Sequence, residues 1–85
     1  MILQVFSVYD SKAKAFSHPF YCPNAEMARR YFANGANDPT LQLCQNSEDF
    51  SLFHLGEWSD ETGQFTSNAA PQPLGLATNF KKEPA

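Results

Sequence analysis

The chain is 85 residues long, which predicts a single small domain with a modest hydrophobic core, and 14% of its residues are aromatic. Its net charge of -3 argues against a protein that coats nucleic acid through bulk electrostatics, because that mode needs many Lys and Arg side chains. The basic residues of the first 34 are Lys12, Lys14, Arg29 and Arg30, so an anion-binding surface is expected in this half.

The first predicted element is a β-hairpin over about residues 2–21. Its opening strand is apolar on both faces, one with Ile2, Phe6 and Val8 and the other with Leu3, Val5 and Tyr9. This pattern suits a central strand with a helix on one side and more of the chain or a partner on the other. Pro19 interrupts the returning strand, which therefore belongs at an edge or carries a bulge.

A helix is predicted over about residues 24–34. Asn24 is a good N-cap, Glu26 suits the first turn, and Gly35 is the expected stop signal. At 100° per residue, one apolar arc collects Ala25, Met27, Ala28, Tyr31 and Phe32. The helix should pack this arc on one face of the sheet, and residues 36–49 then form a connection.

A second hairpin is predicted over about residues 50–67, with an acidic turn closed by Gly63. Tyr9 precedes Phe16 by seven positions and Trp58 precedes Phe65 by the same interval, which indicates a shared hairpin geometry rather than a duplicated unit. The acidic turn lacks the ligand pattern of a calcium loop, so we interpret it as a solvated turn.

The expected fold is α+β: a small antiparallel sheet from the two hairpins, with one helix packed on one face. Residues 68–85 are rich in proline and alanine without a sustained period, so we expect a domain over 1–67 and a flexible tail over 68–85. The first nine residues do not form a secretory leader, and no apolar run approaches the ~20 residues of a membrane span. A cytosolic protein without membrane attachment is expected.

No catalytic, metal or cofactor motif is evident. Cys22 and Cys44 lack the spacing of a zinc or redox motif, and their irregular spacing from His18 and His54 disfavours a Cys₂His₂ site. We therefore interpret both cysteines as small buried thiols, without excluding a disulfide. Cys22, His18 and Asp10 include the residue types of a nucleophilic site but form no recognised motif.

Two binding modes remain open from the residues alone. Lys12, Lys14, Arg29 and Arg30 are candidates to contact phosphates of single-stranded DNA, while Tyr9 or Phe20 stacks on a base. The blander alternative is an ordinary helix surface over a buried aromatic core. In the second mode the chain is a homodimer or docks on a protein partner, with the interface formed by Leu3, Val5, Tyr9 and Trp58.

Several motifs together resemble the small nonstructural protein of gokushovirus-type microviruses, which are bacteriophages with single-stranded DNA genomes. In the first half these are Phe6-Ser7-Val8-Tyr9-Asp10 with Lys12 and Ala13, Pro19-Phe20, Pro23-Asn24, and a helix bearing Ala28, Arg29 and Phe32. In the second half they are Asn37-Asp38-Pro39, Glu48-Asp49-Phe50-Ser51-Leu52, Leu55-Gly56-Glu57 and Asp60-Glu61-Thr62-Gly63. Cys22, Cys44 and the long C-terminal segment depart from the pattern.

The resemblance implies a protein of the infected bacterial cytoplasm that is absent from the mature virion. It implies a non-enzymatic accessory role in viral single-stranded DNA synthesis, through contacts with single-stranded DNA, with phage or host replication proteins, or with both. The alternative is a dimeric protein interaction module without DNA binding. The resemblance supplies no catalytic residue and no cofactor.

Overall fold

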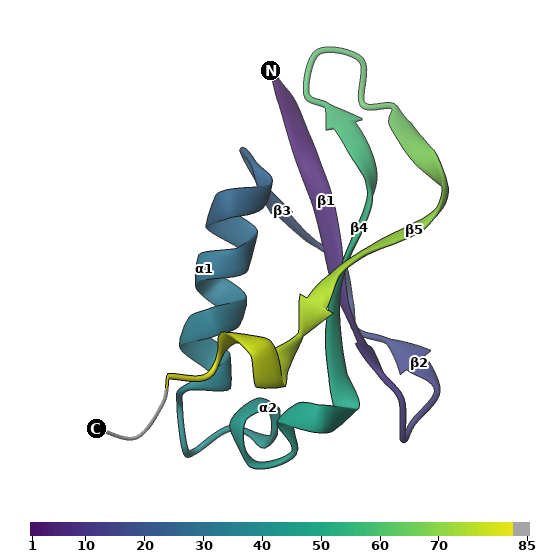
Figure 1. Cartoon of the computed structure of the whole chain (residues 1–85). Helices are drawn as coiled ribbons and strands as arrows, with labels where there is room; N and C mark the ends of the chain where they lie inside the picture. The colour runs from purple at the N-terminus through teal and green to yellow at the C-terminus, as the bar shows by residue number, and fades with distance from the viewer. Residues whose placement is uncertain (83–85) are drawn as a thin grey trace.

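The computed structural model describes residues 1–82, which form one antiparallel sheet of five strands covered on one side by a helix (Figure 1). The strands are β1 Ile2–Asp10, β2 Ala15–Phe16, β3 Phe20–Cys22, β4 Phe50–Ser59 and β5 Phe65–Leu76. The helices are α1 Ala25–Ala36 and α2 Gln42–Gln45, with 3₁₀ turns η1 Ser47–Asp49 and η2 Ala77–Phe80. The α+β class expected from the two hairpins and the helix is confirmed.

β1 is the central strand, as its two apolar faces predict. The strand order is β2-β1-β4-β5, and β3 pairs with β1 along the same edge as β2. Between β2 and β3 the chain leaves the ladder at Ser17, whose hydroxyl accepts the N–H of Val8 at 3.0 Å. The hydroxyl of Ser7 donates to the carbonyl oxygen of Ser17 at 2.7 Å. The expected interruption at Pro19 on an edge strand is confirmed.

The core lies between α1 and the sheet. Phe6 and Leu52 are fully buried beneath α1, which contributes Ala28, Phe32 and Ala36. These three buried residues of α1, four positions apart, form a narrower strip than the predicted apolar arc. Tyr31 lies at the margin of this strip and is 57% exposed. The predicted burial of Tyr31 is therefore wrong, because the small alanines bring the helix close to the sheet along one line.

Both ends of α1 have clear local causes. Asn24 is the N-cap, as predicted: its side-chain oxygen accepts the N–H of Met27 at 2.9 Å. The predicted stop at Gly35 is wrong, since the helix continues to Ala36 and is capped at Asn37. Gly35 instead permits close packing, because a Cβ there would lie 2.6 Å from Cδ2 of Leu43. None of the helices in the described part of the chain is long and apolar enough to cross a bilayer.

The segment after Ser67 differs most from expectation. The predicted flexible tail is wrong for residues 68–80, which continue β5 and form η2. Ala77 is fully buried, Phe80 packs edge-on against Phe32 with ring centroids 5.3 Å apart, and the Asn37 amide donates to the carbonyl oxygen of Phe80 at 3.0 Å. Prolines are tolerated in β5 because it is an edge strand. The domain therefore includes this segment, and residues 83–85 lie outside the described residues.

Candidate functional site

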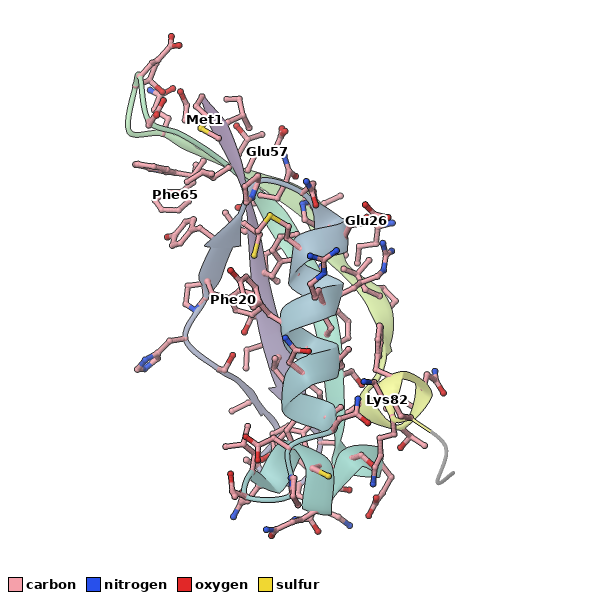
Figure 2. All side chains as sticks on the ribbon, turned by 90° about the vertical axis from the view of Figure 1, so that its left-hand side faces the viewer. Met1, Phe20, Glu26, Glu57, Phe65 and Lys82 are labelled. Carbon is pink, nitrogen blue, oxygen red and sulfur yellow. The ribbon has the colours of Figure 1, made fainter. Side chains whose placement is uncertain are left out.

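Within residues 1–82, no helix or strand covers the face of the sheet opposite α1. Residues paired directly across antiparallel strands share a face, so the pairs Leu3–Trp58, Val5–Tyr21, Tyr9–Phe16 and Trp58–Phe65 all lie on the side opposite Phe6. Figure 2 shows Phe65 pointing away from α1, whereas Phe20 lies between the sheet and the helix. We call this side the open face; its apolar residues are Leu3, Val5, Tyr9, Phe16, Pro19, Tyr21, Phe53, Leu55, Trp58 and Phe65.

The aromatic residues of the open face form two clusters of three rings. In one, the ring centroids of Tyr9 lie 4.9 Å from Phe16 and 6.3 Å from Phe53, and Phe16 lies 5.4 Å from Phe53. Most of these rings meet tilted or edge-on, the preferred geometry of aromatic pairs. Phe16 is 44% exposed, so the cluster presents ring surface to solvent.

The second cluster lies at the other end of the strands and contains Tyr21, Trp58 and Phe65. The ring of Trp58 lies 6.0 Å from that of Tyr21 and 6.4 Å from that of Phe65. Tyr21 is 43% exposed and Phe65 is 61% exposed. Together with Leu3 these rings line a hollow of about 420 Å³. Exposed apolar rings at both ends of one face are typical of an interaction surface.

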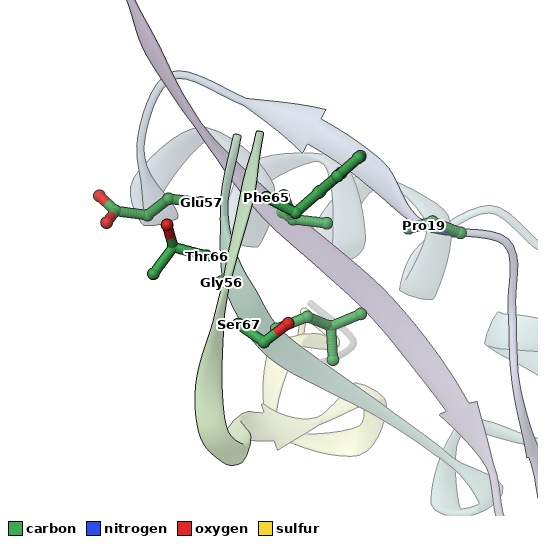
Figure 3. Close-up of a pocket in the computed structure, with 8 residues that line it drawn as sticks. Pro19, Gly56, Glu57, Phe65, Thr66 and Ser67 are labelled. Atoms are coloured by element: carbon green, nitrogen blue, oxygen red, sulfur yellow. The ribbon is translucent and has the colours of Figure 1, made fainter. Parts of the chain in front are cut away.

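A smaller hollow of about 200 Å³ adjoins the second cluster at Phe65 and extends to Pro19 (Figure 3). A bulge in β4 creates its floor: Val5 pairs with Gly56 and Phe6 with His54, which leaves Leu55 unpaired beside Val5 and Pro19. Gly56 allows β5 to approach at this point, because a Cβ there would lie 2.2 Å from the carbonyl oxygen of Thr66. Val5, Pro19 and Leu55 thus give the middle of the open face a mainly apolar lining, with Ser67 at its side.

The turns at the two ends of the open face differ in charge, although Asp10 lies beside the lysines of the first turn and the Met1 amino group beside the carboxylates of the second. Lys12 and Lys14 lie in the turn between β1 and β2, beside Tyr9 and Phe16. Asp60 and Glu61 lie in the turn between β4 and β5, beside Trp58 and Phe65. Because β1 and β4 are antiparallel, the two turns lie at opposite ends of the sheet (Figure 1).

We call these the basic end (Lys12, Lys14, Tyr9, Phe16, Phe53) and the acidic end (Asp60, Glu61, Tyr21, Trp58, Phe65). Within residues 1–82 neither lysine of the basic end forms an ion pair. At the acidic end, the amino group of Met1 lies 2.6 Å from the carboxylate of Asp60 and 3.6 Å from that of Glu61. The two lysines thus differ from the turn carboxylates in having no ion-pair partner among residues 1–82.

The structure divides the residues predicted to bind DNA. Tyr9, Lys12 and Lys14 lie together at the basic end, but Arg29 and Arg30 are on the exposed side of α1, in the other layer. Phe20 packs against Phe6 in the core, with ring centroids 5.8 Å apart. A single surface does not contain all of them, because the strand order places the helix opposite the open face.

The residues predicted for a protein interface do share one surface. Leu3, Val5, Tyr9 and Trp58 all lie on the open face, although Val5 is buried in its floor. Sequence reasoning did not include Phe16 and Phe53. The seven-residue interval from Tyr9 identifies Phe16 as its cross-strand neighbour, and alternation with buried Leu52 identifies Phe53.

Nucleophilic and metal-binding groups are not brought together. Cys22 is buried and Cys44 half-buried, both are free thiols, and burial raises the pKa of Cys22 above its ordinary value. Cys22 pairs with Gln4, whereas Asp10 lies at the opposite end of β1, where its carboxylate accepts the N–H of Lys12 at 2.9 Å. No three His, Cys, Asp or Glu residues among 1–82 are placed to hold a metal ion.

His54 is held on the helix side of the sheet in a polar chain. Its Nε2 lies 2.8 Å from Oε1 of Gln4, and its Nδ1 lies 2.9 Å from the amide nitrogen of Asn68, which also donates to the His54 carbonyl oxygen. An amide N–H facing Nδ1 requires that nitrogen to accept, so Nε2 carries the proton and donates to Gln4. Both ring nitrogens of His54 therefore have hydrogen-bond partners, as expected for a histidine with a structural role.

Comparison with known proteins identifies the family. The model of the family described as phage ORF5 protein matches residues 3–80, which is nearly the whole chain. The chain belongs to the phage ORF5 protein family. The match of this phage protein extends through β5 and η2, so the family pattern includes the C-terminal segment that packs on α1. No curated protein and no solved structure matches the chain.

Proposed function

We propose that this phage ORF5 family member is a non-enzymatic accessory factor in viral single-stranded DNA synthesis, and that it binds single-stranded DNA at the basic end of the open face. The resemblance to the small nonstructural protein of gokushovirus-type microviruses supports this viral setting, in the cytoplasm of the infected bacterium. The observation that carries the proposal is a cluster of three aromatic rings beside two lysines that form no ion pair within residues 1–82.

The rings supply a surface for bases. Phe16 is 44% exposed and touches Tyr9, whose ring it meets at an interplanar angle of 55°. A base stacked on an exposed ring of a single-strand binding protein contributes about 1–3 kcal/mol, without regard to which base it is. The cluster is small, so the site holds only a few nucleotides.

The lysines supply contacts to phosphates. Each contact to single-stranded DNA contributes about -0.7 to the slope of log K against log salt concentration, so two contacts give a slope of about -1.4. The acidic end repels phosphates from the other half of the face. DNA should therefore be confined to the basic end, with a moderate salt dependence.

Lys14 also shows backbone strain. Its φ of 56° lies in the left-handed region, and Gly63 has a φ of 71° at the equivalent position of the other hairpin. A left-handed conformation costs an L-residue about 1–2 kcal/mol, a cost that glycine avoids. A lysine at this position supports a role for its charge rather than for its backbone.

The test is fluorescence anisotropy with a labelled oligothymidylate at several salt concentrations. The variant Lys12→Ala/Lys14→Ala should bind roughly twenty-fold more weakly at 0.1 M salt, because two contacts of about 0.7 log unit each are lost. The matched control is Arg29→Ala/Arg30→Ala, which removes the same charge from α1 and should bind like the wild type. Absence of binding at low salt, or a loss confined to the arginine variant, would contradict the proposal.

A protein partner is the second candidate function, and the acidic end favours it. Tyr21 and Phe65 are exposed beside Asp60 and Glu61, whose charges oppose phosphates and suit a basic partner. In this mode the chain is an interaction module, without DNA binding, for a phage or host replication protein or for a second copy of itself. Sedimentation as a monomer, with no partner bound to the immobilised chain, would count against it.

A further inference from the structure

The two hairpins of the open face share one geometry and carry opposite charge. Tyr9 faces Phe16 across one turn and Trp58 faces Phe65 across the other, with the same seven-residue interval. The left-handed residues Lys14 and Gly63 are each five positions after the first aromatic residue, so the positions of the two turns correspond one to one. Lys12 in one turn therefore corresponds to Glu61 in the other.

This correspondence makes the open face complementary to itself. The two turns lie at opposite ends of the antiparallel pair β1–β4, and each adjoins a cluster of three rings. A second copy turned by 180° about an axis across the strands, in the plane of the face, presents its acidic end to the first copy's basic end. The two-fold axis repeats the contact at the other end.

We propose that the open face binds the open face of a second copy in this end-to-end reversed arrangement. Lys12 and Lys14 of each copy lie against Asp60 and Glu61 of the other, and each basic-end cluster packs on an acidic-end cluster. The apolar middle of the open face, with Pro19 and Leu55, packs against the same region of the second copy. The result is an apolar centre with a charged rim at both ends, as in stable protein interfaces.

Charge disfavours the other face-to-face arrangement. If like ends met, Asp60 and Glu61 would face the same carboxylates of the second copy, and the lysines would face lysines. Like charges placed opposite one another repel and suppress the wrong pairing. The reversed arrangement brings opposite charges together at both ends, where the Met1 amino group partly neutralises the acidic turn.

The pairing covers Tyr9 and Lys12, which the proposed function assigns to DNA. A second copy and single-stranded DNA should therefore compete for the basic end, a consequence that rests on the proposed function. The pairing itself rests only on the geometry and charge of the open face.

The experiment is sedimentation velocity of the purified chain, without nucleic acid, at micromolar concentrations. The wild type should form a reversible dimer. The variants Lys12→Glu/Lys14→Glu and Asp60→Lys/Glu61→Lys should each dimerise about tenfold or more weakly, because each places like charges in contact. An equimolar mixture should restore the dimer, since acidic and basic turns then face each other at both ends.

Two controls make the result decisive. Arg29→Glu/Arg30→Glu reverses the same number of charges on α1 and should dimerise like the wild type. Circular dichroism verifies that every variant retains its secondary structure. A wild-type monomer, or a dimer that the turn variants do not weaken and their mixture does not restore, would overturn the pairing.

Failure of the pairing and failure of the proposed function are distinguishable. A monomer that binds oligothymidylate would reject the pairing and keep the DNA site. A dimer with the expected response to charge reversal that binds no oligonucleotide would keep the pairing and reject the DNA site.

Discussion

Lys14 is the residue at which stability and the proposed function oppose each other. Its turn is built by Asp10, whose carboxylate accepts the N–H groups of Lys12 at 2.9 Å and of Ala13 at 3.3 Å, before Lys14 enters the left-handed region. The turn itself does not require a charged side chain at position 14, since glycine is at the equivalent position of the other turn. The proposed function gives this lysine a reason, as a contact to a DNA phosphate.

We therefore expect Lys14→Gly to raise the free energy of unfolding while it weakens oligonucleotide binding. Relief of the left-handed conformation gives about 1–2 kcal/mol, offset by roughly 0.5–1 kcal/mol from the freer unfolded chain. Urea unfolding measures the net gain. Gly63→Ala is the control at the equivalent position of the other turn. Nothing lies within 4 Å of the added Cβ, so the decrease in its free energy of unfolding measures the cost of the left-handed backbone alone. A less stable Lys14→Gly variant would show that the lysine side chain holds the turn.

At the residue scale, sequence reasoning was most successful where periodicity fixes a side chain's face. Alternation in β1 correctly separated Phe6 and Val8, which face the core, from Leu3, Val5 and Tyr9. It was least successful where burial depends on how closely two elements pack, as at Tyr31, which is exposed. Helical angle alone does not reveal how close the small alanines bring two elements.

At the scale of elements, both hairpins and α1 follow from local signals, but the length of β5 does not. Pro71 and Pro73 are typical of a linker, and only pairing with β4 on one side makes them compatible with an edge strand. η2 likewise depends on contacts with α1 and β5 that are distant in sequence. Tertiary contacts of this kind leave no periodic pattern in the segment itself.

The packing of η2 predicts a clear contrast between two neighbouring apolar residues. Phe80 rests on Phe32 and on Gly75, where an added Cβ would lie 3.0 Å from the Phe80 ring. Phe80→Ala should lower the free energy of unfolding by about 2–3 kcal/mol, somewhat less than a fully buried phenylalanine. Leu76→Ala, at a residue 41% exposed, should cost less than about 1 kcal/mol. Equal effects in urea unfolding would mean that η2 does not stabilise the domain.

At the scale of the whole molecule, the candidate site depends on strand order. The sequence shows four basic residues in its first half, but the order β2-β1-β4-β5 with α1 on one side separates the arginines from the lysines. The same order brings Tyr9, Phe16 and Phe53 together from three strands. Neither result follows from hairpin signals, because these do not determine which strands become neighbours.

The two proposals together predict two exclusive states of the open face. A second copy would cover both ends and DNA the basic end alone, so mass action would determine which state prevails. Rising oligonucleotide concentration should convert dimers into DNA-bound monomers. The acidic turn that identifies the second hairpin then acts as the counterpart of the basic turn when DNA is absent.

The most direct test of the account is the location of single-stranded DNA on the protein. Amide chemical shifts of the ¹⁵N-labelled chain, titrated with oligothymidylate at low salt, report that location. Binding at the basic end predicts perturbations at residues 9–16 and 51–53 that saturate with bound DNA, while the amides of α1 around Arg29 and Arg30 stay unchanged. Perturbations centred on α1, or no perturbation at low salt, would contradict it.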